Sequence, residues 1–385
     1  MKIKAVFYLI LLVCLFSCNT EKNADLPKYK IDIRKGLNNR EQQFVLSDFV
    51  RDVEYVRLET SQECLLSDIY ELVVTSDFIL ISDRKRLLKF GKDGSFIQRI
   101  GRTGKGPAEH GRNIKFNVNE YTNEAYILSN RYQVNVYDLH SGLFKRDFTL
   151  PFITSRFDFI PGNKCLFFTM EFSSKLDSTI TEIFITDSAG VKIDSVPDYN
   201  RLKNNNNVAG SVMLQRNNGY LNYKGHWKDT LYRINNNLEK QSYIAFDCNN
   251  NVSWYDLNVE PEMNGKLDNF IAVSTVLEEK NNLYLTLQMG IPSAGEERVF
   301  KNMLFNKNAK ELSPTNGIRD DIHSGIIFWP KFIVDDVVID HFSAYELMEN
   351  YEQLKNEFDF SDEFKRIAGK LNENDNAILM IGKLR

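Results

Sequence analysis

The cationic side chains between residues 84 and 115 are the strongest candidates for binding chemistry in this sequence. This stretch holds ten Lys or Arg residues against two acids, which gives a net charge of 10 − 2 = +8. Four of its members lie in or after a glycine-rich turn, namely Arg102, Lys105, His110 and Arg112. Guanidinium and ammonium groups bind carboxylates and phosphates through charge-assisted hydrogen bonds. We therefore expect these four residues to bind an anionic ligand, such as an acidic glycan or a lipid head group.

A second stretch carries the opposite charge. Residues 335–375 hold four bases and twelve acids, a net charge of 4 − 12 = −8. If the fold brings the two stretches together, they partly neutralise each other and the basic stretch has a structural role. If the basic stretch lines one mouth of the fold, its field attracts anions. Both interpretations are open on the sequence alone.

No known catalytic motif accompanies these charges. The glycine-rich turn Gly101–Gly106 lacks the G-x-x-x-x-G-K-[ST] spacing of a phosphate-binding loop. The H-E-x-x-H and G-x-S-x-G motifs are absent, and the five histidines are scattered without ligand spacing. We expect no metal and no cofactor. Carboxylates that act together on a sugar are brought together by the fold, so the sequence favours a protein that is not an enzyme without deciding the question.

The composition of the 385 residues is that of a folded protein. Hydrophobic residues make up 43% of the chain and charged residues 26%, which argues against disorder. The net charge of −4 excludes the strongly basic class of nucleic-acid-binding proteins, and we expect no nucleic-acid partner. Length alone suits about two or three domains, but β-rich single domains often reach this size.

The N-terminus has the pattern of an export signal. Two lysines precede Ala5–Phe16, an unbroken apolar run that is too short to span a membrane. Ser17 and Cys18 follow, an arrangement that resembles the bacterial lipobox. We expect residues 1–17 to be a signal peptide, Cys18 to carry lipid, and residues 18–45 to form a tether. An ordinary signal peptide is the alternative.

The lipobox resemblance also implies a location. Acyl chains on the cysteine anchor a protein to a membrane, because each buried methylene contributes about 0.8 kcal/mol. Residue 19 is Asn rather than Asp, which by resemblance to known sorting favours the outer membrane. Whether the protein faces the periplasm or the outside is open.

A strand–turn–strand unit recurs along the chain and must position the residues discussed above. The clearest copy comprises Arg86–Phe90, a Gly-Lys-Asp-Gly turn and Ser95–Ile100. Alternating apolar and polar residues suit half-buried strands, and Gly, Asn and Asp suit tight turns. Pairs of such hairpins start near residues 69, 114, 155, 209 and 270, and a sixth fits 325–339 with 377–381. Four-stranded units at this spacing predict an all-β, six-bladed β-propeller with antiparallel blades over residues 46–385.

The two ends of the chain complete the predicted ring. Val53–Leu58 is an isolated early strand, which we expect to pair in the last blade beside residues 377–384. A capping box at Ser343–Glu346, followed by apolar residues at helical spacing, predicts a small helical insertion over about residues 344–372. A two-domain sandwich is the competing fold, but no linker rich in Pro, Gly or Ser divides the chain.

Several of these segments resemble the bacterial six-bladed β-propeller lipoproteins, a family similar to the NHL and TolB-like propellers. Besides the lipobox and the early strand, they are Phe90–Gly94, Ile100–Glu109 and Ile378–Leu384. The sequence departs from the NHL-like pattern at Pro107–His110, where a second glycine and an aromatic residue are more usual. The resemblance implies the fold and export, and it transfers no catalytic residue.

These expectations describe an envelope-anchored propeller that binds a glycan, a peptide or a partner protein through loops at one mouth of the ring. The alternative is a propeller enzyme, a hydrolase or lyase acting on a sugar or a lactone, because the fold hosts both. A cluster of carboxylates or histidines around the central channel would favour the enzyme. A third hypothesis is a structural subunit of an outer-membrane complex that docks through the helical insertion.

Overall fold

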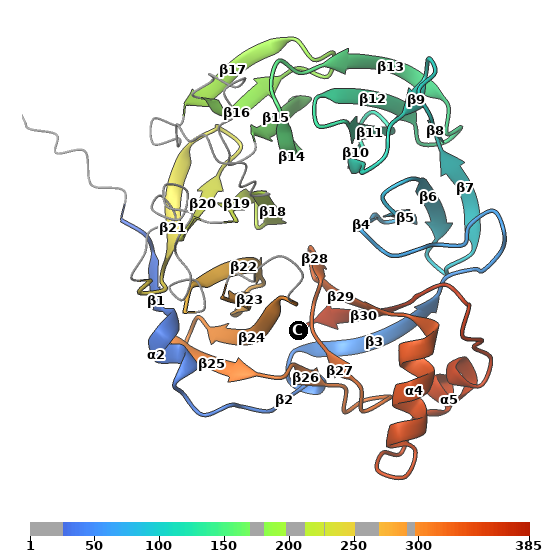
Figure 1. Cartoon of the computed structure of the whole chain (residues 1–385), viewed down its shortest axis with the longest axis vertical. Coiled ribbons are helices and arrows are strands. Elements are labelled where there is room, and N and C mark those ends of the chain that lie inside the picture. Colours follow the sequence, from blue (N-terminus) through green and yellow to red (C-terminus); the bar gives the residue numbers. More distant parts are fainter. Residues whose placement is uncertain (1–25, 170–180, 198–211, 227, 251–268, 291–296) are drawn as a thin grey trace, which may run out of the picture.

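Most strands of the computed structural model belong to antiparallel sheets arranged radially around one axis (Figure 1). The structure describes residues 26–169, 181–197, 212–226, 228–250, 269–290 and 297–385. The predicted signal peptide and Cys18 lie outside these residues. Within them, no helix is both long enough and apolar enough to cross a membrane.

Five blades follow one another along the chain, and each is a four-stranded antiparallel meander with its first strand at the centre of the ring (Figure 1). Blade 1 consists of β4 (Glu71–Val74), β5 (Phe78–Ser82), β6 (Leu87–Gly91) and β7 (Phe96–Ile100). Blade 2 consists of β10 (Lys115–Asn119), β11 (Glu124–Ser129), β12 (Gln133–Asp138) and β13 (Phe144–Thr149). Blade 3 consists of β14 (Thr154–Ile160), β15 (Lys164–Thr169), β16 (Thr181–Thr186) and β17 (Lys192–Pro197). Blade 4 consists of β18 (Val212–Asn217), β19 (Tyr220–Gly225), β20 (Thr230–Ile234) and β21 (Lys240–Asp247). Blade 5 consists of β22 (Ile271–Glu278), β23 (Asn282–Met289), β24 (Val299–Asn306) and β25 (Glu311–Thr315).

The closing blade joins the two ends of the chain, as the sequence predicted. It consists of β28 (Phe332–Val334), β29 (Val337–Phe342), β30 (Ile378–Leu384) and the early strand β3 (Val50–Arg57). Strand β3 runs antiparallel to β30, with Tyr55 opposite Met380. Because the last blade contains strands from both ends, the ring is held shut by backbone hydrogen bonds.

The predicted number of six blades is wrong, because the ring has seven. Seven sheets of three or more strands form within the described residues. The seventh, the short blade, consists of β2 (Phe44–Val45), β26 (Ile318–Arg319) and β27 (Ile327–Phe328). Its strands have two residues each and come from distant parts of the chain, so they leave no repeat in the sequence. The prediction had assigned Ile327–Phe328 to the sixth blade.

The predicted tether is also shorter than expected, because much of residues 18–45 packs on the ring. Strand β1 (Tyr29–Asp32) pairs in parallel with β21 at the rim of blade 4. Helix α2 (Ile33–Leu37) follows, and a Cβ on its Gly36 would lie 2.3 Å from a methyl carbon of Leu312 in blade 5. This arm, residues 29–45, is ordered because β1 pairs with the rim strand β21. Its Ile31 and Ile33 are also buried in the cluster between blades 4 and 5.

The helical insertion lies where the sequence predicted it, between β29 and β30. It comprises α4 (Ala344–Leu354) and α5 (Asp362–Ala368), which project from the ring beside the closing blade (Figure 1). The capping box of α4 is formed, since Ser343 accepts from the backbone N–H of Glu346 and the Glu346 carboxylate accepts from that of Ser343. Short helix η1 (Leu46–Asp48) precedes β3. Ala344, Leu347 and Phe364 are buried, so the apolar stripe packs on the propeller.

The core is divided into clusters that lie between neighbouring blades. One cluster joins blades 2 and 3 through Tyr126, Phe157 and Phe167, and similar clusters join the other pairs. The second strand of blade 2, β11, is buried at every residue, whereas its rim strand β13 alternates between partly buried and exposed residues. Sheets packed on both faces therefore explain the continuous apolar runs of the middle strands.

Glycines in the turns before the rim strands of blades 1 and 2 let adjacent blades approach closely. Gly94, with φ of +84°, lies so near the closing blade that a Cβ would be 2.2 Å from the carbonyl oxygen of Arg57. Gly142, with φ of +70°, occupies the equivalent turn of blade 2, and a Cβ there would be 2.8 Å from the carbonyl oxygen of Arg99. Both the positive φ and the close contact require glycine.

Candidate functional site

Three neighbouring loops of blades 1 and 2 form one continuous surface. They are the turn between β5 and β6, the crossover between blades 1 and 2, and the turn between β11 and β12. The crossover binds the first turn, because Ile114 donates its backbone N–H to the Arg84 carbonyl at 3.2 Å. It also packs on the second turn, where a Cβ on Gly111 would be 2.8 Å from the side-chain oxygen of Asn130. The loops therefore hold one another in place.

The two turns present arginines in an uncommon backbone conformation. Arg84 has φ of +73° and Arg131 has φ of +67°, values that few non-glycine residues adopt. Asp83 holds the first turn, since its carboxylate accepts from the backbone N–H groups of Lys85 at 3.1 Å and Arg86 at 2.8 Å. The buried carboxylate also pairs with the Arg86 side chain at 2.5 Å. Local hydrogen bonds thus stabilise the turn.

Six exposed cations cover these loops, and we call them the basic surface. They are Arg84, Lys85, Arg102, Lys105, Arg112 and Arg131. None of the six forms an ion pair with any residue that the structure describes. Apart from the buried Asp83, the three loops contain a single acid, Glu109. The surface therefore carries an excess of positive charge that the described residues do not neutralise through ion pairs.

The structure brings together three of the four residues predicted to bind a ligand and separates the fourth. Arg102 lies on β8 (Arg102–Thr103), and Lys105 and Arg112 lie in the adjoining loop, all exposed. His110 lies on β9 (Glu109–His110) and is 0% exposed, with its Nδ1 at 3.0 Å from the Gly111 carbonyl oxygen. Burial lowers the pKa of His110, so its imidazole adds no charge to the surface.

The remaining cations of the basic stretch serve the fold. Arg86 pairs with Asp83, Lys115 pairs with Glu71, and Arg99 donates to Thr103 Oγ1 at 2.8 Å. The ammonium groups of Lys89 and Lys92 donate to backbone carbonyls, each at 3.0 Å. Half of the ten cations in residues 84–115 are thus engaged, and the other half belong to the basic surface.

The expected neutralisation across the ring closure is not seen. The acidic stretch pairs with cations from other segments, such as Arg57 with Asp375 at 2.8 Å and Lys331 with Asp340 at 2.9 Å. Within the described residues, which include both stretches completely, no ion pair joins residues 84–115 to residues 335–375. The two charge excesses therefore remain separate surfaces of the molecule.

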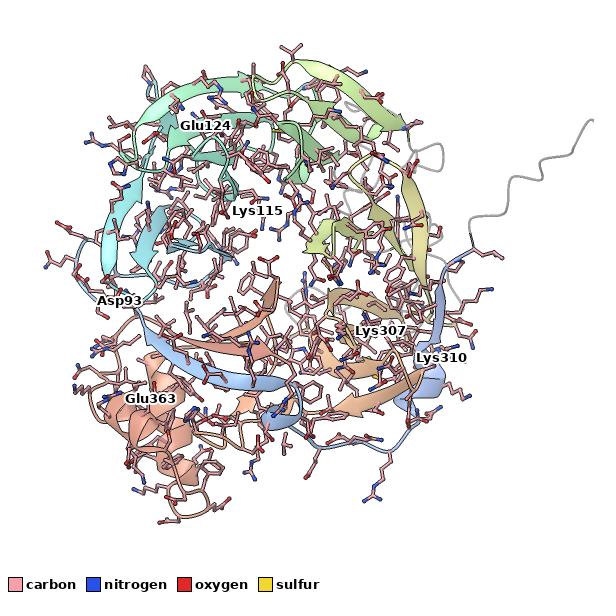
Figure 2. The ribbon with its side chains drawn as sticks, turned by 180° about the vertical axis from the view of Figure 1, so that it is seen from behind. Asp93, Lys115, Glu124, Lys307, Lys310 and Glu363 are labelled. Carbon is pink, nitrogen blue, oxygen red and sulfur yellow. The ribbon has the colours of Figure 1, made fainter. Side chains whose placement is uncertain are left out.

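The inner strands place charged side chains toward the channel, and these side chains are paired. Glu71 on β4 binds both Lys115 on β10 and Arg156 on β14, and Lys115 lies on the inner side of the ring in Figure 2. Asp158 binds Arg216 at 3.0 Å and accepts from the Asn117 amide at 3.0 Å. These contacts connect the inner strands of four successive blades.

The pairing determines what these carboxylates can do. Burial alone would raise the pKa of Glu71, but Arg156 and Lys115 outweigh it and lower this pKa. Glu71 is therefore held ionised and is poorly suited to act as a general acid. In the described parts of the chain, no group of three or more His, Cys, Asp or Glu side chains is arranged to hold a metal ion. The pairing of Glu71 thus suits a structural role for this carboxylate.

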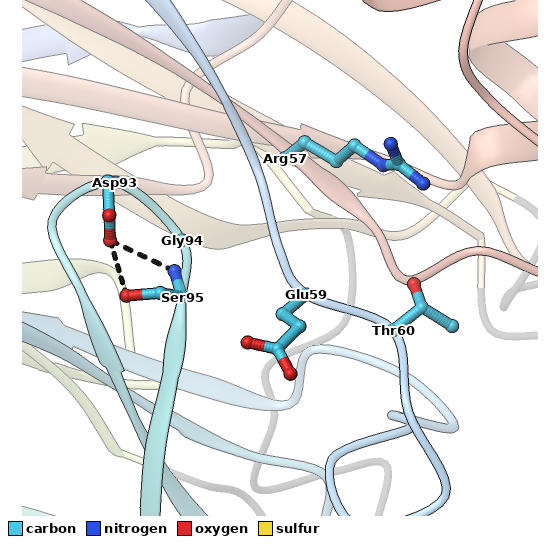
Figure 3. Close-up of a pocket in the computed structure, with 6 residues that line it drawn as sticks. All are labelled: Arg57, Glu59, Thr60, Asp93, Gly94 and Ser95. Carbon is cyan, nitrogen blue, oxygen red and sulfur yellow. Dashed lines mark hydrogen bonds between the residues drawn. The ribbon is translucent and has the colours of Figure 1, made fainter.

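A polar pocket of about 370 Å³ lies at the seam between the closing blade and blade 1 (Figure 3). It is lined by Arg57, Glu59, Thr60, Asp93, Gly94 and Ser95. Its charged groups already have partners: Arg57 binds Asp375, and Asp93 accepts from Ser95 at 2.6 Å and 3.0 Å. Glu59 accepts from the backbone N–H of Phe96 at 2.9 Å. We interpret this pocket as part of the ring closure.

Sequence reasoning missed Arg131 as a member of the basic surface. Arg131 lies outside the basic stretch, and only the fold brings it beside the crossover, where its carbonyl oxygen accepts from Thr154 at 2.7 Å. A signal was present, because the turn between the second and third strands of a blade lies on the same face as the crossovers. Applying that rule to the Asn130–Arg131 turn would have identified it.

The fold defines this protein as a β-propeller, and the surface marks the loops of blades 1 and 2 as its candidate binding region. The chain belongs to the family described as "Domain of unknown function (DUF4934)", whose sequence model matches residues 28–383. A search of curated proteins finds no match.

Among solved structures, the chain is similar to a protein of Bacteroides fragilis NCTC 9343 to which export is ascribed. The TM-score is 0.66 at 18% sequence identity, and the alignment covers 93% of this chain and 99% of that one. A member of the DUF4221 family from Bacteroides vulgatus ATCC 8482 has a TM-score of 0.46 at 12% identity, covering 87% of this chain and 97% of that one. At these identities the first likeness shows the propeller fold alone.

Proposed function

We propose that this protein is an interaction module that binds an acidic glycan through the basic surface. The observation that carries the proposal is the set of six exposed cations on three interlocked loops, none of them paired with an acid of the described chain. Uncompensated positive charge attracts anions. Four of the six are arginines, whose planar guanidinium matches carboxylates and similar oxyanions. A polymer with repeated anionic groups contacts several of these cations at once, which strengthens binding.

The same cations suit a lipid head group less well. Stable binding at a membrane surface combines cations with apolar side chains that enter the lipid. Tyr132, 48% exposed, is the one large apolar side chain exposed on these three loops. The surface is therefore better matched to a soluble polyanion. Binding to phosphatidylglycerol vesicles without binding to any acidic glycan would contradict the proposal.

We also propose that the protein is exported and anchored by lipid at Cys18 to the outer membrane. The lipobox-like N-terminus supports this proposal, and so does the likeness to a protein to which export is ascribed. Membership of the NHL or TolB-like class stays a prediction, and whether the protein faces the periplasm or the outside is open. An anchored ring with binding loops at one mouth would hold a glycan close to the membrane.

Charge reversal tests the binding proposal. We expect the double variant Arg102→Glu with Lys105→Glu to bind chondroitin sulfate and polygalacturonate more weakly, by about tenfold, because each reversed surface charge contributes roughly 0.7 kcal/mol. The measurement is isothermal titration calorimetry on residues 19–385. The matched control reverses Lys280 and Lys310, exposed lysines of blade 5 that also form no ion pair within the described residues. Unchanged affinity for every anionic glycan tested would refute the proposal.

A further inference from the structure

The crossover loop of the basic surface closes around a carboxylate of its own. The side chain of Glu109 turns back into the loop, where its Oε2 accepts from the backbone N–H of Gly106 at 2.8 Å. Gly104 lies against the same oxygen, because a Cβ on Gly104 would be only 1.8 Å from it. The two glycines thus allow the backbone to surround an oxyanion.

This arrangement has the chemistry of an anion site. Backbone N–H groups of a glycine-rich turn, together with nearby cations, are what proteins use to bind phosphate and similar oxyanions. Arg102 and Lys105 belong to the same loop and are exposed. The N–H groups of Lys105 and Ala108 donate to no group in the described chain, so further donors are free for a ligand. The oxyanion now in the loop is the Glu109 carboxylate.

The loop backbone does not depend on that carboxylate alone. Gly104 donates its N–H to the His110 carbonyl at 3.0 Å, and the Tyr137 hydroxyl donates to the Ala108 carbonyl at 3.1 Å. Residue Glu109 donates its own N–H to the Gly106 carbonyl at 3.2 Å. Because these bonds involve backbone groups, the side chain of Glu109 can leave the loop while the loop keeps its shape.

We propose that the Gly104–Glu109 loop is an oxyanion subsite of the basic surface and that Glu109 occupies it as an internal competitor. A sulfate or carboxylate group of the ligand binds there by displacing the Glu109 carboxylate from the Gly106 N–H. This inference rests on the proposed function, because it concerns the same ligand and the same surface. An anion then binds at this subsite only if its own contacts outweigh the hydrogen bond between Glu109 and Gly106.

Two variants of Glu109 separate displacement from a simple effect of charge. Glu109→Gln removes the charge, and its neutral amide oxygen is a weaker acceptor for the Gly106 N–H, so tighter binding is expected in either case. Glu109→Asp keeps the charge but is one methylene too short to reach the Gly106 N–H in the same backbone. Displacement predicts that Glu109→Asp also binds inorganic sulfate and chondroitin sulfate more tightly, by about fivefold, the effect of losing one competing hydrogen bond.

The experiment is calorimetric titration of residues 19–385 and both variants, with Glu120→Asp and Glu120→Gln as controls. Glu120 is an exposed acid of blade 2 in the turn between β10 and β11, away from the basic surface. Tighter binding by Glu109→Asp, with an unchanged melting temperature, supports displacement. Tighter binding by Glu109→Gln alone overturns it and leaves the proposed function intact. If neither the wild type nor any variant binds, both proposals fail.

A second readout does not depend on the variants. In the wild type, saturating sulfate must move the amide resonance of Gly106, because its hydrogen-bond acceptor changes from Glu109 to the ligand. An unmoved Gly106 resonance in a protein that binds sulfate elsewhere would overturn the displacement.

Discussion

At the scale of single residues, buried carboxylates are held ionised by cations from other strands of the same blade or of other blades. Glu124 on β11 is 4% exposed and pairs with Arg146 and Lys145, each at 2.7 Å. Burial would raise the pKa of Glu124, but hydrogen bonds from Arg146, Lys145 and Thr122 lower it to about 2. The folded state therefore binds the proton of this group less readily than the unfolded state, where the pKa is near 4.5.

This pKa predicts part of the acid sensitivity of the protein. The contribution of Glu124 to stability is complete above about pH 4.5 and is lost as the pH falls towards 2. We expect Glu124→Gln to lower the free energy of unfolding by about 2 kcal/mol at pH 7. The variant should also lose less stability than the wild type between pH 4.5 and 2. Melting temperatures across this pH range check the prediction, with Glu120→Gln as the control. An equally steep acid loss in both variants would contradict it.

The exposed cations of the site could be predicted from the sequence, but the burial of the histidine beside them could not. Arg102, Lys105 and Arg112 are exposed on one loop, as expected for ligand-binding residues. His110 is next to them in sequence but buried, because β9 turns alternate side chains to opposite sides. Neighbourhood in sequence predicts a shared loop, but the orientation of each side chain depends on the strand that carries it.

At the scale of elements, the turn glycines determine how tightly neighbouring blades pack. Gly94 and Gly219 both have positive φ, of +84° and +77°, so alanine would strain either turn. A Cβ on Gly94 would collide with the carbonyl of Arg57 in the closing blade, whereas a Cβ on Gly219 would meet nothing within 4 Å. Alanine variants of these two glycines therefore distinguish the cost of backbone strain from the cost of a collision between blades.

We expect Gly94→Ala to destabilise the protein more than Gly219→Ala. Both variants suffer the strain of positive φ, roughly 1–2 kcal/mol, and the collision adds a further cost of about 1–3 kcal/mol, similar to overpacking in a core. Chemical denaturation of the two variants and the wild type measures the difference. Equal destabilisation would mean that the closing blade shifts freely, and the seam would then not be tightly packed.

Regular elements were predictable and irregular ones were not. The strands of blades 1 to 5 alternate or run apolar at a repeated spacing, and the helix at Ala344–Leu354 has a capping box. The short blade has strands of two residues, such as Phe44–Val45, which are too short for any periodicity. Strand β1 forms because β21 pairs with it at the rim and Ile31 is buried beside that strand. Its four residues are too few to show a periodicity.

At the scale of the whole molecule, the average charge is a poor guide to the surface. The net charge of −4 combines a basic stretch of +8 and an acidic stretch of −8. The helical insertion carries Glu363 on the outside of the ring (Figure 2), and the basic surface lies over blades 1 and 2. No ion pair connects the two stretches in the described chain, so the two charge excesses stay on separate parts of the surface.

The proposed anchor leads to a prediction for the intact protein in its cell. We expect Cys18→Ala to move the protein from the membrane fraction to the soluble fraction, because stable attachment depends on the acyl chains. Cys14→Ala is the control, since residue 14 lies in the proposed signal peptide and carries no lipid in this proposal. Cell fractionation and incorporation of labelled palmitate measure the outcome. Retention of the Cys18→Ala protein in the membrane fraction would contradict the lipid anchor.

The pairing of β3 with β30 has a consequence for how the chain is made. Strand β3 ends at residue 57, and its partner begins at residue 378, so this contact forms only after the blades between them have been synthesised. Until then β3 is an exposed edge that can pair with other chains. Contacts this distant in sequence also slow folding. The C-terminal strand therefore acts as the last step of assembly, and a chain truncated before residue 378 would be an open ring prone to aggregation.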